Sequence, residues 1–338
     1  MVSHNDVSDI GADPFRERAG RAFGKHKQIL GGYFRFESNS EVLLQLVEAA
    51  FGELPQHRLP VAATEFHIEL RLVQRPRAME IDEPAPLRMQ SGAGLIAGVM
   101  DECNYVMLAP MQHRALVVVS EDMLGHAYHV RYEFIEFAVF VLAARGSNLV
   151  PLHGACVGRD GRGILLLGAS GAGKSTLALH SLLRGLDFLA EDAVFVQAES
   201  MLATGVANYL HVQADALRFI DDEPARDWIA QAPVIHRRSG VAKFEVDLRR
   251  GPARLAATPL ALVGAILVSN ELANDPDELL SPLAADEAAA QLVADQPYGA
   301  VQPGWPQFEQ ALLRLGVYRL RRGAHPQRSV DALEPLLR

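Results

Sequence analysis

The chain has 338 residues, more than one hydrophobic core usually supports, so the sequence predicts two domains. Its formal net charge of −9 argues against a nucleic-acid-binding protein, because such proteins carry a basic surface that displaces counterions from phosphates. Cys103 and Cys156 are too few for a disulfide framework and are not spaced as metal ligands. This cysteine usage predicts a cytoplasmic location.

Residues 1–20 are polar and mixed in charge, without the apolar segment of a signal peptide, and we expect them to form a flexible tail. Residues 64–73 alternate between apolar and polar side chains, which is the period of a half-buried strand. Ser38 or Ser40 is placed to cap a helix with an apolar stripe over residues 43–51. Further strands are predicted at residues 29–36, 95–100, 105–108 and 115–120.

Residues 132–145 are strongly apolar and predict a helix, with Gly146 as its left-handed terminator. The most apolar stretch covers about half of the roughly 20 residues that span a bilayer, so we expect no membrane association. We place the domain boundary after this helix. Residues 21–146 then form a smaller N-terminal α+β domain, for which we expect a role in substrate recognition, and residues 147–338 form an α/β domain.

A strand-loop-helix-strand unit is predicted near the start of the second domain. Residues 164–167 predict a short buried strand, residues 174–184 a helix stopped by Gly185, and residues 186–190 the next strand. Later strands are predicted at residues 194–196, 240–246, 262–268 and 317–320, and later helices at residues 286–294 and 329–337.

The loop of this unit matches the pattern G-x-x-x-x-G-K-[ST] between a strand and a helix, the setting that the pattern demands. Its glycines let successive amide groups point at phosphate oxygens, Lys174 reaches the β- and γ-phosphates, and Ser175 supplies a hydroxyl to Mg²⁺. The alternative, a glycine-rich turn with a helix-capping serine, leaves the lysine unexplained. We therefore expect a P-loop that binds ATP or another nucleoside triphosphate with Mg²⁺. Its residues are Gly168, Ala169, Ser170, Gly171, Ala172, Gly173, Lys174, Ser175 and Thr176.

Glu191 and Asp192 end the strand after this helix, which in an open α/β sheet places them at the edge beside the phosphates. Phosphoryl transfer to an alcohol needs one carboxylate near the metal and one that takes the hydroxyl proton. A polar exit from the strand would explain the same pair of residues. His153 is ambiguous as well, because a lone histidine on an apolar strand is more often a core residue than a catalytic one.

Three stretches with their spacing intact resemble the C-terminal domain of the HPr kinase/phosphorylase family. They begin at His153, Gly163 and Arg184 and read HGACV, GILLLGASGAGKSTLAL and RGLDFLAED. The resemblance implies a P-loop kinase domain of the phosphoenolpyruvate carboxykinase-like type, which transfers a phosphoryl group from ATP to a protein serine. It also implies that Asp192 is the general base and that Glu191 lies on the metal side with Ser175. By the same resemblance, His153 and Lys174 act near the phosphates.

Two departures from the family pattern narrow the activity that we expect. Bifunctional members carry Glu after the P-loop serine and two Asp in the acidic pair, where this chain has Thr176 and Glu191. The later glycine-rich signature linked to phosphorolysis is absent from the sequence, so we expect kinase activity without phosphorylase activity. The overall layout is similar to HPr-kinase-like proteins encoded beside peptide-modification genes, including kinases of lasso-peptide precursors. We therefore expect a serine-bearing protein or peptide as partner, and self-association stays open.

Two other functions fit the same motifs, namely a small-molecule kinase and a regulatory module that binds ATP without transferring phosphate. Arg237, Arg238 and Lys243 flank Ser239-Gly240, where a mobile cation would neutralise the transferred phosphoryl group, although solvated surface charge explains most such residues. The basic cluster at residues 319–322 is assigned to the surface.

Overall fold

The computed structural model describes residues 20–75, 83–275 and 278–338. The tail predicted at residues 1–20 lies outside the described residues except for Gly20. The chain divides into two compact units. The N-terminal unit comprises residues 20–27, Phe34–Ala50 and Glu65–Val139, and the C-terminal unit comprises Gln28–Tyr33, Phe51–Thr64 and Phe140–Arg338.

This division differs from the predicted boundary at residue 146, because two early segments pack within the C-terminal unit. His57 shows why: its ring is buried, with Nδ1 2.8 Å from the Thr204 hydroxyl and Nε2 2.9 Å from the Ala256 carbonyl oxygen. A carbonyl only accepts hydrogen bonds, so Nε2 carries the proton and Nδ1 accepts from the hydroxyl. Burial lowers the pKa of His57, which keeps the ring neutral.

The N-terminal unit is built on a seven-stranded sheet in the described part of the chain, with strand order β1-β2-β3-β7-β6-β5-β4. Strands β3 and β7 are parallel, and the pairs from β7 through β6 and β5 to β4 are antiparallel. The strands are β1 (Phe23–Ile29), β2 (Gly32–Ser38), β3 (Glu65–Val73), β4 (Arg88–Gly92), β5 (Leu95–Val99), β6 (Tyr105–Ala109) and β7 (Arg114–Ser120).

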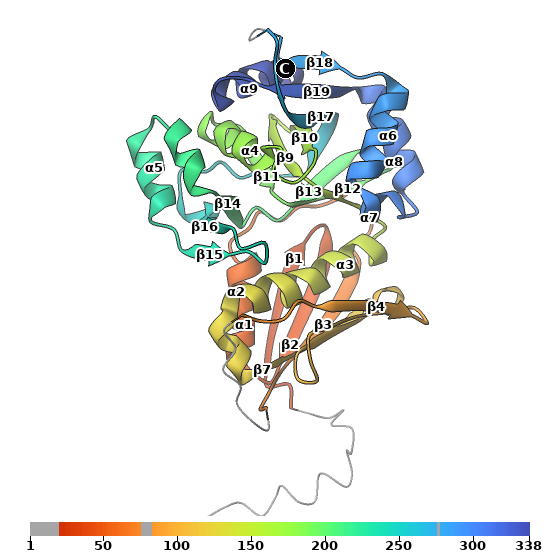
Figure 1. Ribbon diagram of the computed structural model, residues 1–338. Helices are drawn as coiled ribbons and strands as arrows, with labels where there is room; N and C mark the ends of the chain where they lie inside the picture. The colour runs from red at the N-terminus through yellow and green to blue at the C-terminus, as the bar shows by residue number, and fades with distance from the viewer. Residues whose placement is uncertain (1–19, 76–82, 276–277) are drawn as a thin grey trace, which may run out of the picture. The chain divides into compact units, whose positions relative to one another are not determined.

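Several helical segments of this region carry buried apolar side chains. In α1, Leu43, Leu44 and Val47 are almost fully buried, as their predicted stripe requires. Figure 1 shows the labelled helices and strands. The helical segments are α1 (Glu41–Phe51), η1 (Pro110–Gln112), η2 (Glu121–His126), α2 (Ala127–His129), η3 (Val130–Glu136) and α3 (Phe137–Gly146).

Three predictions for this region need correction. The strand predicted at residues 29–36 is a hairpin, because Leu30 and Gly31 both adopt positive φ and turn the chain. The apolar helix begins as the π-helix η3, whose wider turn suits the buried ion pair between Arg131 and Glu136, five residues apart. The left-handed residue after α3 is Asn148 rather than Gly146. Strand β4 was not predicted, because every residue in it is exposed and no alternation marks it.

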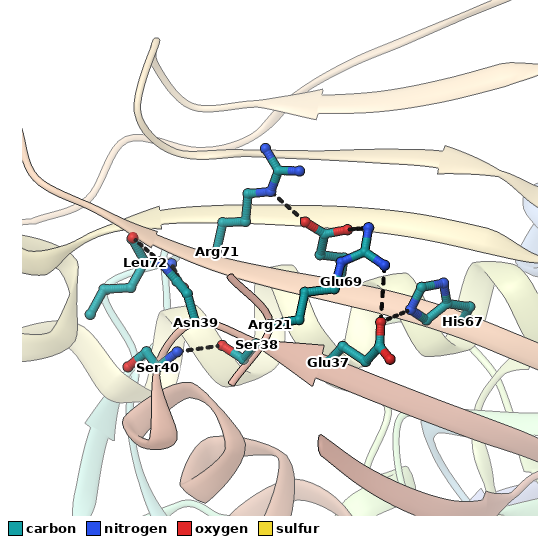
Figure 2. A network of polar contacts seen from close by, with 9 residues as sticks. All are labelled: Arg21, Glu37, Ser38, Asn39, Ser40, His67, Glu69, Arg71 and Leu72. Atoms are coloured by element: carbon teal, nitrogen blue, oxygen red, sulfur yellow. Dashed lines mark hydrogen bonds and ion pairs between the residues drawn. The ribbon is translucent and has the colours of Figure 1, made fainter. Parts of the chain in front are cut away.

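A network of charged side chains covers β2 and β3 of the N-terminal unit (Figure 2). Arg21 lies 3.2 Å from a Glu37 oxygen and 2.6 Å from a Glu69 oxygen. His67 Nε2 lies 2.8 Å from Glu37, and Arg71 pairs with Glu69. Each carboxylate in this network therefore has at least two cationic or imidazole partners.

The C-terminal unit has a central sheet of nine strands within the described residues. Its main path is β11-β9-β10-β17-β13-β12-β8, and β19 joins β17 to β18. The strands are β8 (Val150–His153), β9 (Ala155–Arg159), β10 (Arg162–Leu167), β11 (Asp187–Ala190), β12 (Ala193–Gln197), β13 (Leu202–Gly205), β17 (Leu260–Leu272), β18 (Leu280–Pro282) and β19 (Val317–Arg322).

Helices cover both faces of this sheet, so the strand residues are apolar on both sides. Ile164 and Leu166 of β10 belong to one cluster with α4 and α9, and Leu165 and Leu167 belong to another with α6 and α8. Such burial on both faces explains the continuous apolar run. The helical segments are α4 (Lys174–Leu183), η4 (Ala214–Phe219), α5 (Glu223–Ala230), η5 (Leu248–Arg250), α6 (Ala285–Asp295), α7 (Pro297–Ala300), α8 (Trp305–Leu315), α9 (Pro326–Leu333) and η6 (Glu334–Leu337).

The strand-loop-helix-strand prediction is confirmed in its elements, but the two strands are not neighbours. Strand β9 lies between β10 and β11 and is antiparallel to both, so β10 and β11 run in the same direction. A separate small sheet has the order β14-β16-β15, with strands β14 (Tyr209–Val212), β15 (Val234–His236) and β16 (Ala242–Asp247). No helix among the described residues combines the length and apolarity needed to cross a bilayer.

Candidate active site

The glycine-rich loop joins β10 to α4 in a conformation that its glycines make accessible. Gly168, Gly171 and Gly173 all have positive φ, at 130°, 79° and 103°. A Cβ on Gly168 would lie 2.6 Å from the Val268 carbonyl oxygen, so no larger residue fits there without moving backbone. Gly173 precedes the first turn of α4, and no side chain caps that turn among the described residues. Its amide groups therefore retain hydrogen-bonding capacity for an anion.

Lys174 is 9% exposed and folds back onto this loop. Its ammonium donates to the carbonyl oxygens of Gly168 at 2.7 Å and Ala169 at 3.1 Å. Burial lowers the pKa of Lys174, opposed mainly by the carboxylates of Asp192 and Asp295. An ammonium group has three donors, so the two carbonyls leave one that a ligand can use.

Asp192 lies two residues after β11, at the same edge of the sheet as the end of β10, because the two strands run in the same direction. Arg237 donates to its Oδ2 at 2.7 Å. Burial would raise the pKa of Asp192, but Arg237, His211 and His153 together hold it below its ordinary value. Asp192 has φ of 64°, an uncommon angle for a non-glycine residue.

Glu191 points into a more buried environment than its neighbour. Its side chain is 3% exposed, and its Oε2 accepts the His211 backbone N–H at 2.8 Å and lies 3.3 Å from Nδ1 of the same residue. His211 Nε2 lies 3.5 Å from Glu245. Burial would lower the pKa of His211, yet the two carboxylates raise it. The Oε1 of Glu191 is buried and has no hydrogen-bond partner among the described residues.

His153 is exposed at the end of β8, so it is not the core histidine that an apolar strand suggests. Its Nδ1 lies 3.2 Å from the Asp192 carbonyl oxygen. Gln296 accepts the His153 backbone N–H at 2.7 Å and donates to its carbonyl oxygen at 3.0 Å. These paired bonds fix the end of β8 against the residue that follows α6.

The remaining candidate residues lie on β16, in the glycine loop, in the first turn of α4 or on the surface. Lys243 lies on β16, and its charge acts on Lys174. Ser170 is exposed at the tip of the loop, whereas Ser175 and Thr176 lie half-buried in the first turn of α4. Arg319 pairs with Glu287 at 2.7 Å on the surface.

Sequence reasoning missed three residues of this site, His211, Asp295 and Gln296. They come from β14 and from the end of α6, far along the chain from the loop, and no motif marks them. An acidic residue in the last turn of a helix, where the helix dipole disfavours it, is the one signal that could have singled out Asp295.

The side chains of this site supply too few ligands to hold a metal ion by themselves, so a bound phosphate would have to supply the others. No group of three or more His, Cys, Asp or Glu side chains among residues 20–75, 83–275 and 278–338 is arranged to hold one. The unpaired Oε1 of Glu191 and the Ser175 hydroxyl are oxygen ligands of the kind that Mg²⁺ binds. The residues present therefore fit Mg²⁺ bound together with phosphate oxygens.

Comparison with known proteins adds a distant structural likeness. No protein-family model and no curated protein sequence matches the chain. Among solved structures, one similar chain is the Hpr(Ser) kinase/phosphatase from Coxiella burnetii, with a TM-score of 0.27 and 16% sequence identity, covering 55% of this chain and 87% of that one.

Proposed function

We propose that the chain is an ATP-dependent kinase that transfers the γ-phosphoryl group to a serine hydroxyl of a protein or peptide. The observation that carries the proposal is a glycine loop with a buried lysine at the same edge of the sheet as the Asp192 carboxylate, because β10 and β11 run in the same direction. A phosphate-binding loop alone would fit any nucleotide-binding protein. Asp192 beside it supplies the group that an alcohol acceptor needs.

The loop and Lys174 bind the triphosphate in this proposal. The amide N–H groups at the start of α4 donate hydrogen bonds to phosphate oxygens, and Lys174 exchanges the carbonyls of Gly168 and Ala169 for the β- and γ-phosphates. Ser175 and Glu191 would hold Mg²⁺. When bound, Mg²⁺ neutralises phosphate charge and orients the γ-phosphoryl group.

Asp192 orients the serine hydroxyl and takes its proton as the serine oxygen bonds to the γ-phosphorus and the bond to the β–γ bridging oxygen breaks. A carboxylate with a lowered pKa is a weak base, which suits a loose transition state in which the phosphoryl group carries little demand for a strong nucleophile. Arg237 donates to Oδ2 of Asp192, and the second carboxylate oxygen, Oδ1, is the atom that takes the hydroxyl proton in this proposal. The guanidinium supplies positive charge for the transferred phosphoryl group.

The test compares wild type with Asp192→Asn in MgATP binding by calorimetry and in transfer from γ-labelled ATP to a library of serine-containing peptides. Binding should survive in the variant, and transfer should fall by at least ~10², the typical contribution of a general base. Equal transfer by the two proteins would refute the role of Asp192. Binding without transfer to peptides would favour a small-molecule kinase if small alcohols are labelled, and a regulatory module if they are not.

A further inference from the structure

Strand β15 forms one edge of the small sheet (Figure 1), because β16 is its only neighbouring strand among the described residues. The carbonyl oxygen of Pro233, just before β15, accepts the Glu245 N–H at 2.8 Å. In an antiparallel pair, every second residue makes such bonds to its partner strand. The N–H and carbonyl groups of Val234 and His236 are therefore directed away from β16, and neither residue has a hydrogen bond among the described residues. This edge offers donors and acceptors at the spacing of an extended chain.

The turn after β15 connects this open edge to the candidate active site. The Arg237 N–H donates to the Val241 carbonyl oxygen at 3.0 Å, and the Gly240 N–H donates to the Arg237 carbonyl oxygen at 2.8 Å. Gly240 has a φ of 77°, in the left-handed region that favours glycine. The turn fixes the backbone of Arg237, whose guanidinium donates to Oδ2 of Asp192 at 2.7 Å. The open edge therefore leads directly to a residue in contact with the proposed general base.

One face of the small sheet carries the side chains that contact Glu191-Asp192. His211 of β14 lies opposite Glu245 of β16, and Arg237 pairs with Val241, four residues before Glu245. Opposed residues share a face and faces alternate along a strand, so His211 and Arg237 lie on the same face. His211 contacts the first carboxylate of the pair at 3.3 Å, and Arg237 contacts the second. A strand added beside β15 would continue this face past the second carboxylate.

The β15–β16 hairpin is basic, although the whole chain is acidic. Residues 234–243 contain Arg237, Arg238 and Lys243 and no Asp or Glu, whereas the chain has a formal net charge of −9. Val234 is 53% exposed on the open edge. Basic and apolar groups at an open edge complement a partner with acidic and apolar side chains. An extended peptide fits such an edge, because its backbone supplies the hydrogen bonds and its alternate side chains supply specificity.

We infer that the acceptor is an extended acidic peptide, which adds to the small sheet as a strand beside β15 and places its serine on the face of Asp192. This inference rests on the proposed function and names the form in which the acceptor binds. A neighbouring strand lies about 4.8 Å away, and its side chains alternate between the two faces. A serine on the face of Arg237 presents its hydroxyl to Oδ1 of Asp192. A serine inside a helix cannot bind in this way, because its backbone groups are already bonded within the helix.

The first measurement compares two short peptides with a central serine, in which valine alternates with aspartate in one and with lysine in the other. In transfer from γ-labelled MgATP, the KM of the acidic peptide should be at least about tenfold lower, because its charges complement the basic hairpin. The acidic peptide is then N-methylated at one amide at a time. Only alternate amides face β15, so alternate methylations should raise KM about 5- to 10-fold and the intervening ones should not.

The second measurement removes a donor from the protein. His236→Pro deletes one N–H that is directed away from β16, and proline is tolerated on an edge strand for that reason. The KM for the acidic peptide should rise about 5- to 10-fold, the loss of one hydrogen bond. His236→Ala keeps the N–H and should raise KM less than about threefold. Calorimetric titration of each protein with MgADP reports whether its nucleotide site is intact.

Equal KM values for the two peptides, or a methylation series without alternation, would overturn the inference. Equal KM values for wild type and His236→Pro would do so as well, as would labelling of other serine peptides but of neither of these two. The methylation series uses the wild-type protein, so it is decisive even if His236→Pro does not fold. All these outcomes leave the proposed function standing, whereas a wild-type protein that labels no serine peptide would refute that function and the inference with it.

Discussion

Two networks of charged side chains, one in each unit, contain similar residues but differ in how far they satisfy one another. In the N-terminal unit, Glu37 and Glu69 each contact at least two cationic or imidazole groups. In the C-terminal unit, Glu191 and Asp295 each keep a buried oxygen without a hydrogen-bond partner among the described residues. The first network is complete by itself, and the second has capacity for a ligand.

The contrast explains why residue type alone does not identify a site. Ion pairs with an exposed partner, as Arg21 is at 42% exposed, contribute about 0–1 kcal/mol each, so such charged sheet faces are common. A buried unpaired oxygen costs about 1–3 kcal/mol and persists only when something else requires it. Glu191 and Asp295 therefore differ from Glu37 and Glu69 in their unmet hydrogen bonds rather than in their number of charges.

The largest expected effect is that of Lys174→Ala on nucleotide binding. Removing the ammonium deletes charge-assisted hydrogen bonds to phosphate, and MgATP affinity should fall by on the order of 10³. Lys27→Ala in the N-terminal unit, where the lysine pairs with Glu48 at 2.8 Å, is the control and should leave affinity unchanged. Calorimetric titration of both variants measures the difference. Unaltered affinity in Lys174→Ala would remove the distinction between the two networks.

The second-largest effect is a difference in stability between substitutions at two glycines with positive φ, one in each unit. Gly168→Ala places a Cβ 2.6 Å from the Val268 carbonyl at a positive φ, and should lower the free energy of unfolding by about 3 kcal/mol. Gly94 also has positive φ, at 77°, but a Cβ there would meet nothing within 4 Å. Gly94→Ala should therefore cost only about 1 kcal/mol. Urea denaturation of both variants measures the gap, and equal costs would contradict the packing argument.

The third effect tests the pair between Arg237 and Asp192. Since the pKa of Asp192 is lower in the folded protein than its ordinary value, the pair stabilises the fold above about pH 4 and loses this effect as the pH falls through the folded pKa. Arg237→Ala should cost about 1–2 kcal/mol at pH 7, and that cost should shrink below about pH 4. A double-mutant cycle with Asp192→Asn isolates the pair. A coupling free energy between Arg237 and Asp192 that does not change with pH would exclude a stabilising ion pair between them.

The smallest effect is expected for Arg21→Gln, which removes the central cation of the N-terminal network. Arg21 is 42% exposed, so the loss should stay below about 1 kcal/mol and should vanish in 1 M salt. Chemical denaturation at low and high salt measures it. A cost above about 2 kcal/mol would mean that this network resembles a buried one.

The sequence predicted the parts of the structure that depend on nearby residues. The glycine loop, α4 and the strand that ends before Glu191 follow from local pattern, and the structure confirms these elements. The insertion of β9 between β10 and β11 could not be predicted, because strand order depends on pairings between distant segments. Asp295 and His211 were missed for the same reason. The assigned roles of Asp192, Glu191 and His153 remain predictions.

The buried ring of His57 also constrains how the chain is made. Its two hydrogen-bond partners follow 147 and 199 residues later, so the segment that carries it leaves the ribosome long before the groups that it must meet. At a synthesis rate of about 5–20 residues per second, the delay between His57 and Ala256 is roughly 10–40 s. The C-terminal unit therefore cannot be completed during synthesis until Ala256 has emerged. A chain cut between residues 64 and 140 would leave Thr204 and Ala256 without their imidazole, so we expect removal of everything before α3 to destabilise the C-terminal unit.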